Sequence, residues 1–311
     1  MLAPIKLNTA TESEYCTYAR ATKHNEIWWY FNGLARIPGF SKPFVDGAGS
    51  WWYAVKPGFA WPVNFFASPA SQAAGFWRQP LLGWQFRTDD AVANSKVWMN
   101  VIHDLAGFDI SRVDPDKRRA VRKGLKGLNL VPLNPSDVGV AAEACEVWNS
   151  HVARTGWNTA MSIERFAATW RELRDWPGTT IIGARDQQSG LLCSWLIARV
   201  IDDVVYVDTL ASHTERLENR PNDAIVYATL FSAASQSVAK AHYSLKSSNE
   251  SLERFKASMG FECFGFPARL VLRWPVGSLL RAFKPQLYQR LRGELNWART
   301  VAIGSTAAEI A

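Results

Sequence analysis

The order of apolar segments between residues 135 and 274 constrains the fold of this chain more than any other feature. Two stretches with apolar residues at helical spacing are followed by three short apolar runs separated by polar turns. A helix, a strand, a second helix and a final strand complete the series. Three consecutive strands with short turns indicate an antiparallel meander, and the alternation after them indicates crossover connections. The pattern predicts an α/β (α+β layered) fold, a mixed sheet with helices on both faces, rather than a doubly wound one.

Capping residues predict where these helices begin. Asn134 or Ser136 is expected to cap the first helix, Ser162 the second and Asn249 the last. The side chains of such residues accept hydrogen bonds from first-turn N–H groups that have no partner inside the helix. Pro221 is expected to open the helix between the third and fourth strands, because proline suits the first helical turn.

A strongly basic segment, "SRVDPDKRRAVRKGLKGL", precedes this region at residues 111–128. Ser111 or Asp114 is a candidate cap, with Pro115 in the first turn. Two interpretations are open, a solvated connecting helix and a helix that faces an anion. The 311 residues carry a formal net charge of +7, which suits an anionic partner such as a phosphorylated cofactor, nucleic acid or a membrane surface.

The first 100 residues are aromatic-rich and contain short strand and turn signals. Their tryptophans favour core packing, with sugar or base stacking as the alternative. The segment 276–298 is basic and amphipathic and is interrupted by Pro285. It is expected to pack on the body, or to make peripheral contact with an anionic membrane. We therefore divide the chain into 1–130, 131–275 and a tail at 276–311, of which "STAAEIA" is expected to be disordered.

Four scattered cysteines form no CxxC pair and no zinc-ligand spacing, so no metal site is expected. Buried free thiols are the predicted state, which favours a reducing cytoplasm. The N-terminus lacks the pattern of a signal peptide, and no apolar run is long enough to span a membrane. The sequence thus predicts a cytoplasmic protein.

Four local matches between residues 115 and 275 carry a resemblance to a known family. They are "RRAVRKGLKGL", "DDVVYVDTLAS", "RPNDAIVYATLFSAA" and "ESLERFKASMGFE". In this order they resemble the Gcn5-related N-acetyltransferase fold, and within it the FemAB-like peptidyltransferases and CelD-type acetyltransferases. The resemblance implies tandem domains, the N-terminal one degenerate. It also implies an acyl- or aminoacyltransferase acting on an amine or hydroxyl, with a small molecule or a cell-envelope or polysaccharide precursor as acceptor.

The loop at 212–220 departs from typical members of this fold, which place a Gly-rich loop there for the coenzyme A pyrophosphate. No glycine occurs in it. FemAB-like proteins also lack that loop, and the resemblance implies that some take their donor from aminoacyl-tRNA. Acyl-CoA and aminoacyl-tRNA both stay open as donors. The expected donor-binding residues are Ser212, His213, Arg216, Arg220 and Asn222, with a solvated loop of paired Arg and Glu as the alternative.

The strand "VVYVDTLA" supplies the next candidates. Tyr206 and Asp208 share one face of the strand, since side chains alternate. Tyr206 is a candidate substrate-binding residue, and Asp208 would suit proton transfer if buried; the alternative is a partly exposed carboxylate near a strand end. His213 and His242 are further candidate bases, or incidental histidines.

Lys256 is the remaining catalytic candidate. It lies about 40° from Leu252 on the helical wheel and so borders the buried stripe. The resemblance implies a role for the lysine of an FK pair, here Phe255-Lys256, in holding an acyl carbonyl or a phosphate. A snorkelling surface lysine is the alternative. Ser247 and Asn249, just before this helix, are candidate substrate contacts. A non-catalytic relative that binds an anionic ligand or surface is the alternative function.

Overall fold

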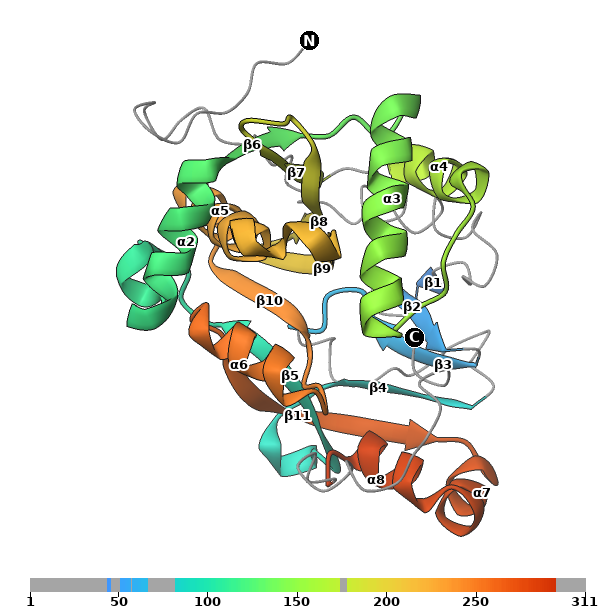
Figure 1. Cartoon of the computed structure of the whole chain (residues 1–311). Coiled ribbons are helices and arrows are strands. Elements are labelled where there is room, and N and C mark those ends of the chain that lie inside the picture. The colour runs from blue at the N-terminus through green and yellow to red at the C-terminus, as the bar shows by residue number, and fades with distance from the viewer. Residues whose placement is uncertain (1–43, 46–50, 57, 67–81, 174–177, 295–311) are drawn as a thin grey trace.

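A single mixed sheet organises the molecule. The structure, a computed structural model, describes residues 44–45, 51–56, 58–66, 82–173 and 178–294 (Figure 1). Within them, eleven strands follow the order β1-β2-β3-β4-β11-β5-β10-β9-β8-β7-β6. The first five are β1 Phe44–Val45, β2 Trp51–Lys56, β3 Phe59–Pro62, β4 Gly83–Arg87 and β5 Ser95–Ile102. The others are β6 Leu128–Pro132, β7 Thr179–Asp186, β8 Leu192–Ile201, β9 Val204–Ser212, β10 Lys240–Leu245 and β11 Glu262–Leu272.

Seven α-helices accompany the strands in the described residues. Two large apolar clusters place them in layers, one joining β8, β9 and β10 to α2 and α5, the other joining the opposite face to α3 and α4. Figure 1 shows these two layers on either side of the sheet. The predicted mixed sheet with helices on both faces is thus confirmed. The helices are α2 Pro115–Gly127, α3 Val138–Thr155, α4 Ile163–Glu172, α5 Pro221–Ser235, α6 Glu250–Ser258, α7 Val276–Phe283 and α8 Pro285–Arg292.

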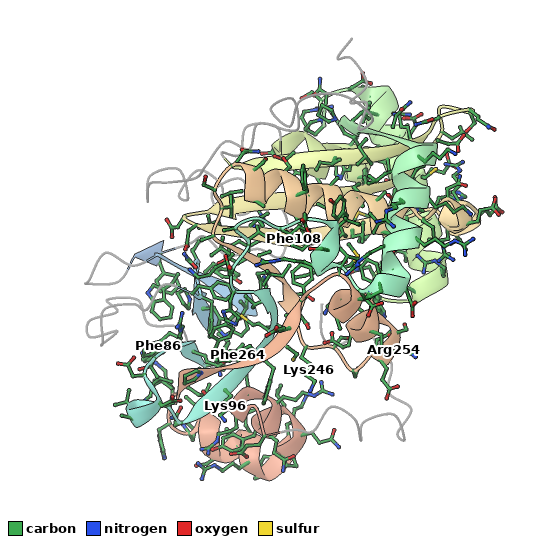
Figure 2. All side chains as sticks on the ribbon, turned by 90° about the vertical axis from the view of Figure 1, so that its left-hand side faces the viewer. Phe86, Lys96, Phe108, Lys246, Arg254 and Phe264 are labelled. Atoms are coloured by element: carbon green, nitrogen blue, oxygen red, sulfur yellow. The ribbon has the colours of Figure 1, made fainter. Side chains whose placement is uncertain are left out.

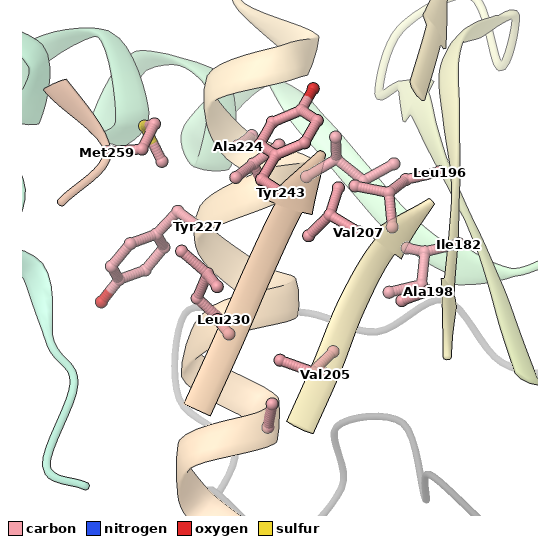
Figure 3. Packing of buried hydrophobic residues seen from close by; sticks show 14 of the residues in the cluster. Ile182, Leu196, Ala198, Val205, Val207, Ala224, Tyr227, Leu230, Tyr243 and Met259 are labelled. Atoms are coloured by element: carbon pink, nitrogen blue, oxygen red, sulfur yellow. The ribbon is translucent and has the colours of Figure 1, made fainter. Parts of the chain in front are cut away.

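The predicted meander is present, with β7, β8 and β9 paired antiparallel in chain order. α5 then crosses one face and returns the chain as β10, parallel to β9. Val205, Val207 and Leu230 are completely or almost completely buried between these strands and α5, and Figure 3 shows them beside Tyr243 and Ala224. The apolar alternation of the strands therefore explains why the sheet holds this helix.

β5 lies between β10 and β11 and is antiparallel to both. It comes from the first 130 residues, yet it joins two strands of the segment 131–275. Its buried positions Val97, Met99 and Val101 alternate along the strand and so place one apolar face of β5 in the core. The tandem arrangement and the boundary at residue 130 stay predictions.

Capping follows the predictions at three helices and departs from them at one. Asp114, Ser162 and Asn249 cap α2, α4 and α6 through their side chains. The predicted cap of α3, Asn134 or Ser136, is wrong. Asp137 caps α3 by accepting from the N–H groups of Gly139 and Val140, while the Asn134 side chain accepts from Ser136 in the preceding turn.

The tryptophans described among the first 100 residues include core residues, as predicted: Trp52 and Trp84 are buried, and Trp61 packs against a buried cluster. Farther along the chain, the indole of Trp195 packs against those of Trp148 and Trp170. Among the cysteines, Cys145 and Cys193 are buried but Cys263 is exposed, so the expectation of buried thiols is wrong for Cys263. Cys16 and the segment "STAAEIA" lie outside the described residues.

Candidate functional site

β9 and β10 separate part of the way along their length. Their parallel pairing runs from Lys240 opposite Val204 to His242 opposite Tyr206 and then stops. β9 continues to Ser212, while the end of β10 pairs with β5 at Leu245. We call this divergence, from Val207 to Ser212 on one side and Tyr243 to Leu245 on the other, the β9–β10 fork. The divergence leaves backbone groups of β9 available on one edge.

A bulge in β9 accompanies the fork. Ile197 pairs with Thr209 and Ala198 with Val207, so Asp208 is the extra residue. Arg199 lies opposite Tyr206, and its guanidinium forms an ion pair with the Asp208 carboxylate. The Asp208 side chain is 35% exposed. Of the two interpretations of Asp208, the structure shows the partly exposed carboxylate, because the bulge turns Asp208 toward solvent and Arg199 neutralises it.

Tyr206 lies among aromatic side chains, away from the end of the fork. Its hydroxyl donates to Oδ1 of Asn64 at 3.0 Å, and its ring lies 5.2 Å from that of His242. Burial raises the pKa of Tyr206. Burial also lowers the pKa of His242 to about 3, with the positive charges of Lys256 and Arg199 acting in the same direction. Both groups are thus neutral near pH 7 and belong to an aromatic cluster.

Polar side chains collect at the open end of β9. Arg154 on α3 donates from Nη2 to Oγ of Ser212 at 3.1 Å, and Nδ2 of Asn222 on α5 donates to the same oxygen at 3.3 Å. Ser194 lies opposite Ser212 in register and is completely buried, with no hydrogen-bond partner for its hydroxyl in the described residues. Oδ1 of Asn222 is also buried and unpartnered there. This end of the fork therefore offers donors and an acceptor for a polar group.

The loop after β9 is anchored to its surroundings. Arg216 donates to the Leu192 carbonyl at 2.7 Å and lies 3.4 Å from the Glu146 carboxylate, which also faces Nε2 of His213. Arg216 and His213 thus follow the alternative of a loop with paired Arg and Glu. Arg220 is the last residue of the loop and has a φ of 56°. No side-chain hydrogen bond caps the N-terminus of α5, which begins at the next residue.

The first turn of α5 is covered by α2. A Cβ on Gly124 would lie 2.7 Å from the Arg220 carbonyl and 2.8 Å from Cβ of Ala224, so only glycine permits this approach. Lys117 of α2 forms an ion pair with Asp223, Nζ to Oδ1 2.7 Å, and Asp223 is buried. A helix N-terminus ordinarily attracts anions. Here the N-terminus of α5 already carries the Asp223 carboxylate and packs against α2.

Lys256 is completely buried on α6. Its Nζ lies 2.7 Å from Oε1 of Glu253 and donates to the Leu245 carbonyl at 3.2 Å. Burial lowers the pKa of Lys256, although Glu253 opposes the shift. The side chain does not snorkel, so the alternative of a surface lysine is wrong, and a role in holding an acyl carbonyl or a phosphate stays a prediction. Lys256 neutralises Glu253 beneath the end of β10.

Ser247 and Asn249 belong to the same polar cluster. The Ser247 N–H donates to Oε1 of Glu253 at 2.9 Å, and the Asn249 side chain caps α6. Asn100 on β5 adds weak hydrogen bonds to Glu253 and to the Leu245 carbonyl, both 3.4 Å. Any substrate contact of Ser247 or Asn249 stays a prediction.

An open hollow of about 440 Å³ lies between α2 and α6. Asp114, Lys117, Arg220, Arg254 and Phe255 are among its lining residues. The ammonium of Lys117 lies 5.0 Å from the centre of the Phe255 ring. Arg220 and α6 both line this hollow. The sequence could not reveal that they meet, because Arg220 lies 30 residues before the start of α6.

The predicted residues thus do not form one site. Ser212 and Asn222 meet at the open end of β9, and Lys256 joins Ser247 and Asn249 at α6. The others lie apart from these two groups: His213 and Arg216 face Glu146, Arg220 lines the hollow beside α6, and Tyr206 and Asp208 lie further back along β9. Sequence reasoning missed Arg154, His151 and Ser194. His151 and Arg154 are one turn apart at the end of α3 and face each other at 3.3 Å. Burial and Arg154 lower the pKa of His151 to about 4.

No group of metal-binding side chains occurs among the described residues. Within the same part of the chain, no helix has the length and apolarity needed to cross a membrane.

The meander, the forked parallel pair and the helices around them define the Gcn5-related N-acetyltransferase-like fold of the FemAB type, as the resemblance predicted. The structure of FemX is similar with a TM-score of 0.58 at 10% identity, over 88% of this chain and 98% of that one. The C-terminal domain of a putative lysylphosphatidylglycerol synthetase from Agrobacterium fabrum gives 0.53 at 12% identity, over 85% and 93%.

The L-PGS structure from Bacillus licheniformis gives a TM-score of 0.51 at 12% identity, over 90% of this chain and 99% of that one. No family model matches the chain, and no curated protein matches it in sequence. At these identities the likeness concerns the fold.

Proposed function

We propose that this protein is an aminoacyltransferase that moves an aminoacyl group from aminoacyl-tRNA to an amine or hydroxyl of a cell-envelope component. The single observation that carries acyl transfer is the β9–β10 fork, where β9 keeps a free edge beside Arg154, Ser212 and Asn222. Such an edge can align an extended acyl group, and alignment supplies much of the rate acceleration in acyl transfer. One similar structure bears the name lysylphosphatidylglycerol synthetase, which supports an envelope acceptor.

The chemistry requires few groups. The acceptor amine or hydroxyl attacks the ester carbonyl of the donor, the new amide or ester bond forms, and the ester C–O bond breaks. The departing tRNA hydroxyl takes up the proton that the acceptor loses. Arg154 carries a positive charge beside the open end of β9 and is placed to stabilise the oxyanion. Burial and Arg154 lower the pKa of His151 to about 4, so it is neutral near pH 7 and a weak base, and the proton passes to the departing hydroxyl instead.

The packing of α2 over the first turn of α5 favours aminoacyl-tRNA over acyl-CoA as the donor. A pyrophosphate at the first turn of α5 would meet the Asp223 carboxylate and the packed surface of α2. α2 also presents Arg119, Arg122 and Lys123 as exposed cations, and these form no ion pair within the described residues. An exposed row of cations on one helix suits a phosphate backbone.

The test is transfer of labelled amino acids from a mixed pool of charged tRNA into total lipid and nucleotide-linked envelope precursors. Label should enter one of these fractions with the wild-type protein. The Arg154→Ala variant should transfer more slowly, and acetyl-CoA should neither donate nor raise the unfolding midpoint. If acetyl-CoA raised the unfolding midpoint and donated its acetyl group, the donor would be acyl-CoA and not aminoacyl-tRNA.

The second candidate is a non-catalytic protein of this fold that binds an anionic ligand. The arrangement of Lys256 and Asp208 favours it, because both are held by internal partners, Glu253 and Arg199. Absence of transfer from charged tRNA and from acyl-CoA, with retained binding of uncharged tRNA, would select this candidate.

A further inference from the structure

The end of the molecule formed by α7 and α8 exposes large apolar side chains. Trp274 is 90% exposed and Phe283 78% exposed, and Leu279 and Leu287 are also exposed. Leu279 and Phe283 are four residues apart on α7, so they lie on the same face of the helix. Single exposed apolar residues need no explanation, but several large ones gathered on one helix pair indicate a binding surface.

The same stretch carries charge of only one sign. From Arg273 to Gly293 the sequence has five Lys and Arg residues and no Asp or Glu. Lys284 follows Phe283 directly and Arg281 precedes it by two residues, and both are exposed. A soluble protein partner does not require exposed apolar side chains together with charge of one sign. An anionic lipid surface requires both, because aromatic and leucine side chains enter the headgroup boundary while cations bind the phosphates.

The end of α8 is held to the sheet by hydrogen bonds. Gln85 on β4 donates to the Leu291 carbonyl at 2.9 Å, and the Trp98 indole on β5 donates to the Gly293 carbonyl at 3.1 Å. A Cβ on Gly293 would lie 2.3 Å from the Lys96 carbonyl, which shows how closely the end of α8 approaches β5. Figure 2 shows α7 and α8 beside Lys96, at the end of the molecule away from α3 and α4.

We propose that Trp274, Leu279, Phe283 and Leu287, with Arg281 and Lys284, form a docking surface for an anionic phospholipid bilayer. The occupant is the bilayer rather than a second copy of the chain, because two copies would bring like charges together at this surface. β5 connects the surface to the Lys256 cluster, since Trp98 holds α8 and Asn100, two residues on, contacts Glu253. The inference does not depend on the transfer reaction.

The test is sedimentation with vesicles of phosphatidylcholine alone, or of phosphatidylcholine and phosphatidylglycerol in equal parts. The wild-type protein should bind the anionic vesicles and lose much of this binding at high salt. The double variant Trp274→Ser/Phe283→Ser should bind at least about tenfold more weakly. Arg281→Gln/Lys284→Gln should weaken binding to anionic vesicles, with little change for phosphatidylcholine alone.

A matched control removes exposed apolar groups elsewhere. Val138→Ser/Trp157→Ser changes two exposed side chains on and beside α3, and it should bind vesicles as the wild type does. Far-UV circular dichroism and the unfolding midpoint should be unchanged in every variant, since the substituted groups are exposed. Failure of the wild type to bind anionic vesicles, or equal binding by Trp274→Ser/Phe283→Ser, would overturn the proposal. If the wild type forms a dimer that dissociates when Phe283 is substituted, the occupant of the surface is a second copy of the chain, and the proposal is overturned.

Discussion

Lys256 and Glu253 form an ion pair, Nζ to Oε1 2.7 Å, in which the lysine is completely buried. The ammonium also binds the last carbonyl of β10, at Leu245. The pair therefore connects α6 to the end of the strand that forms one side of the β9–β10 fork. A lysine in this position stabilises the fork's geometry even if it never touches a substrate.

Replacing Lys256 with methionine should lower the free energy of unfolding by about 3 kcal/mol or more, because it leaves the Glu253 carboxylate without its ion-pair partner. Urea denaturation measures this loss. The control is Lys246→Met, whose ammonium lies 5.4 Å from the Trp98 ring centre and should contribute under about 1 kcal/mol. Unchanged stability in Lys256→Met, together with lost transfer, would make Lys256 a catalytic residue instead.

Gly124→Ala should destabilise the protein by about 1–3 kcal/mol, because the new methyl group collides with the Arg220 carbonyl and with Ala224. Gly127→Ala in the same helix is the matched control. A Cβ there meets nothing within 4 Å, and alanine should leave stability unchanged or raise it by up to about 1 kcal/mol. Equal effects at both positions would contradict the close packing of α2 on α5.

Stability should fall as the pH drops below about 6.5, in part because of His242. The folded protein holds the pKa of His242 at about 3, whereas the unfolded chain protonates it near 6.5. Between these values the unfolded state binds the additional proton, so protonation favours unfolding by up to roughly 1.4 kcal/mol per pH unit.

His242→Phe should flatten this dependence. Urea denaturation between pH 7 and pH 5 measures it, a range above most carboxylate titrations. Phenylalanine keeps the ring contacts with Phe66 and Tyr206. An identical slope in variant and wild type would show that His242 takes up its proton equally in both states.

Arg154→Ala should reduce aminoacyl transfer about tenfold or more, since it removes the cation beside Ser212 at the open end of β9. The residue is exposed, so the unfolding midpoint should change little. Arg165→Ala on α4, another exposed arginine, should transfer at the wild-type rate. Steady-state transfer from charged tRNA measures both variants, and equal rates would remove Arg154 from the proposed site.

Much of the fold was predictable because its signals are local. Short apolar runs between polar turns marked β7, β8 and β9, and Ser162 and Asn249 cap helices as their positions predict. The cap of α3 was misassigned because Asn134, Ser136 and Asp137 are all competent caps within four residues. Only the observed backbone decides which side chain reaches the first-turn N–H groups.

The candidate site was predictable in residue choice but not in arrangement. Ser212 and Asn222 do meet, because a strand and the helix after it are joined by a short loop. Arg154 reaches Ser212 from 58 residues away, and no local pattern signals such a contact. The bulge at Asp208 also escaped prediction, because one extra residue depends on how β8 and β9 pair.

The sequence by itself determined the elements between residues 135 and 274 and their order, because periodicity and capping act between residues close in the chain. The FemAB-type fold followed from the resemblance of four local motifs, and the order of β1 to β5 was not predicted. Tertiary structure alone decided that β5 enters the sheet between β10 and β11, that α2 covers the first turn of α5, and that Lys256 is buried against Glu253. Each of these depends on surfaces that meet only when distant segments pack together. The helix "SNESLERFKASMGF" specifies its own cap and apolar stripe, but the partner of its lysine is fixed by the end of β10 above it.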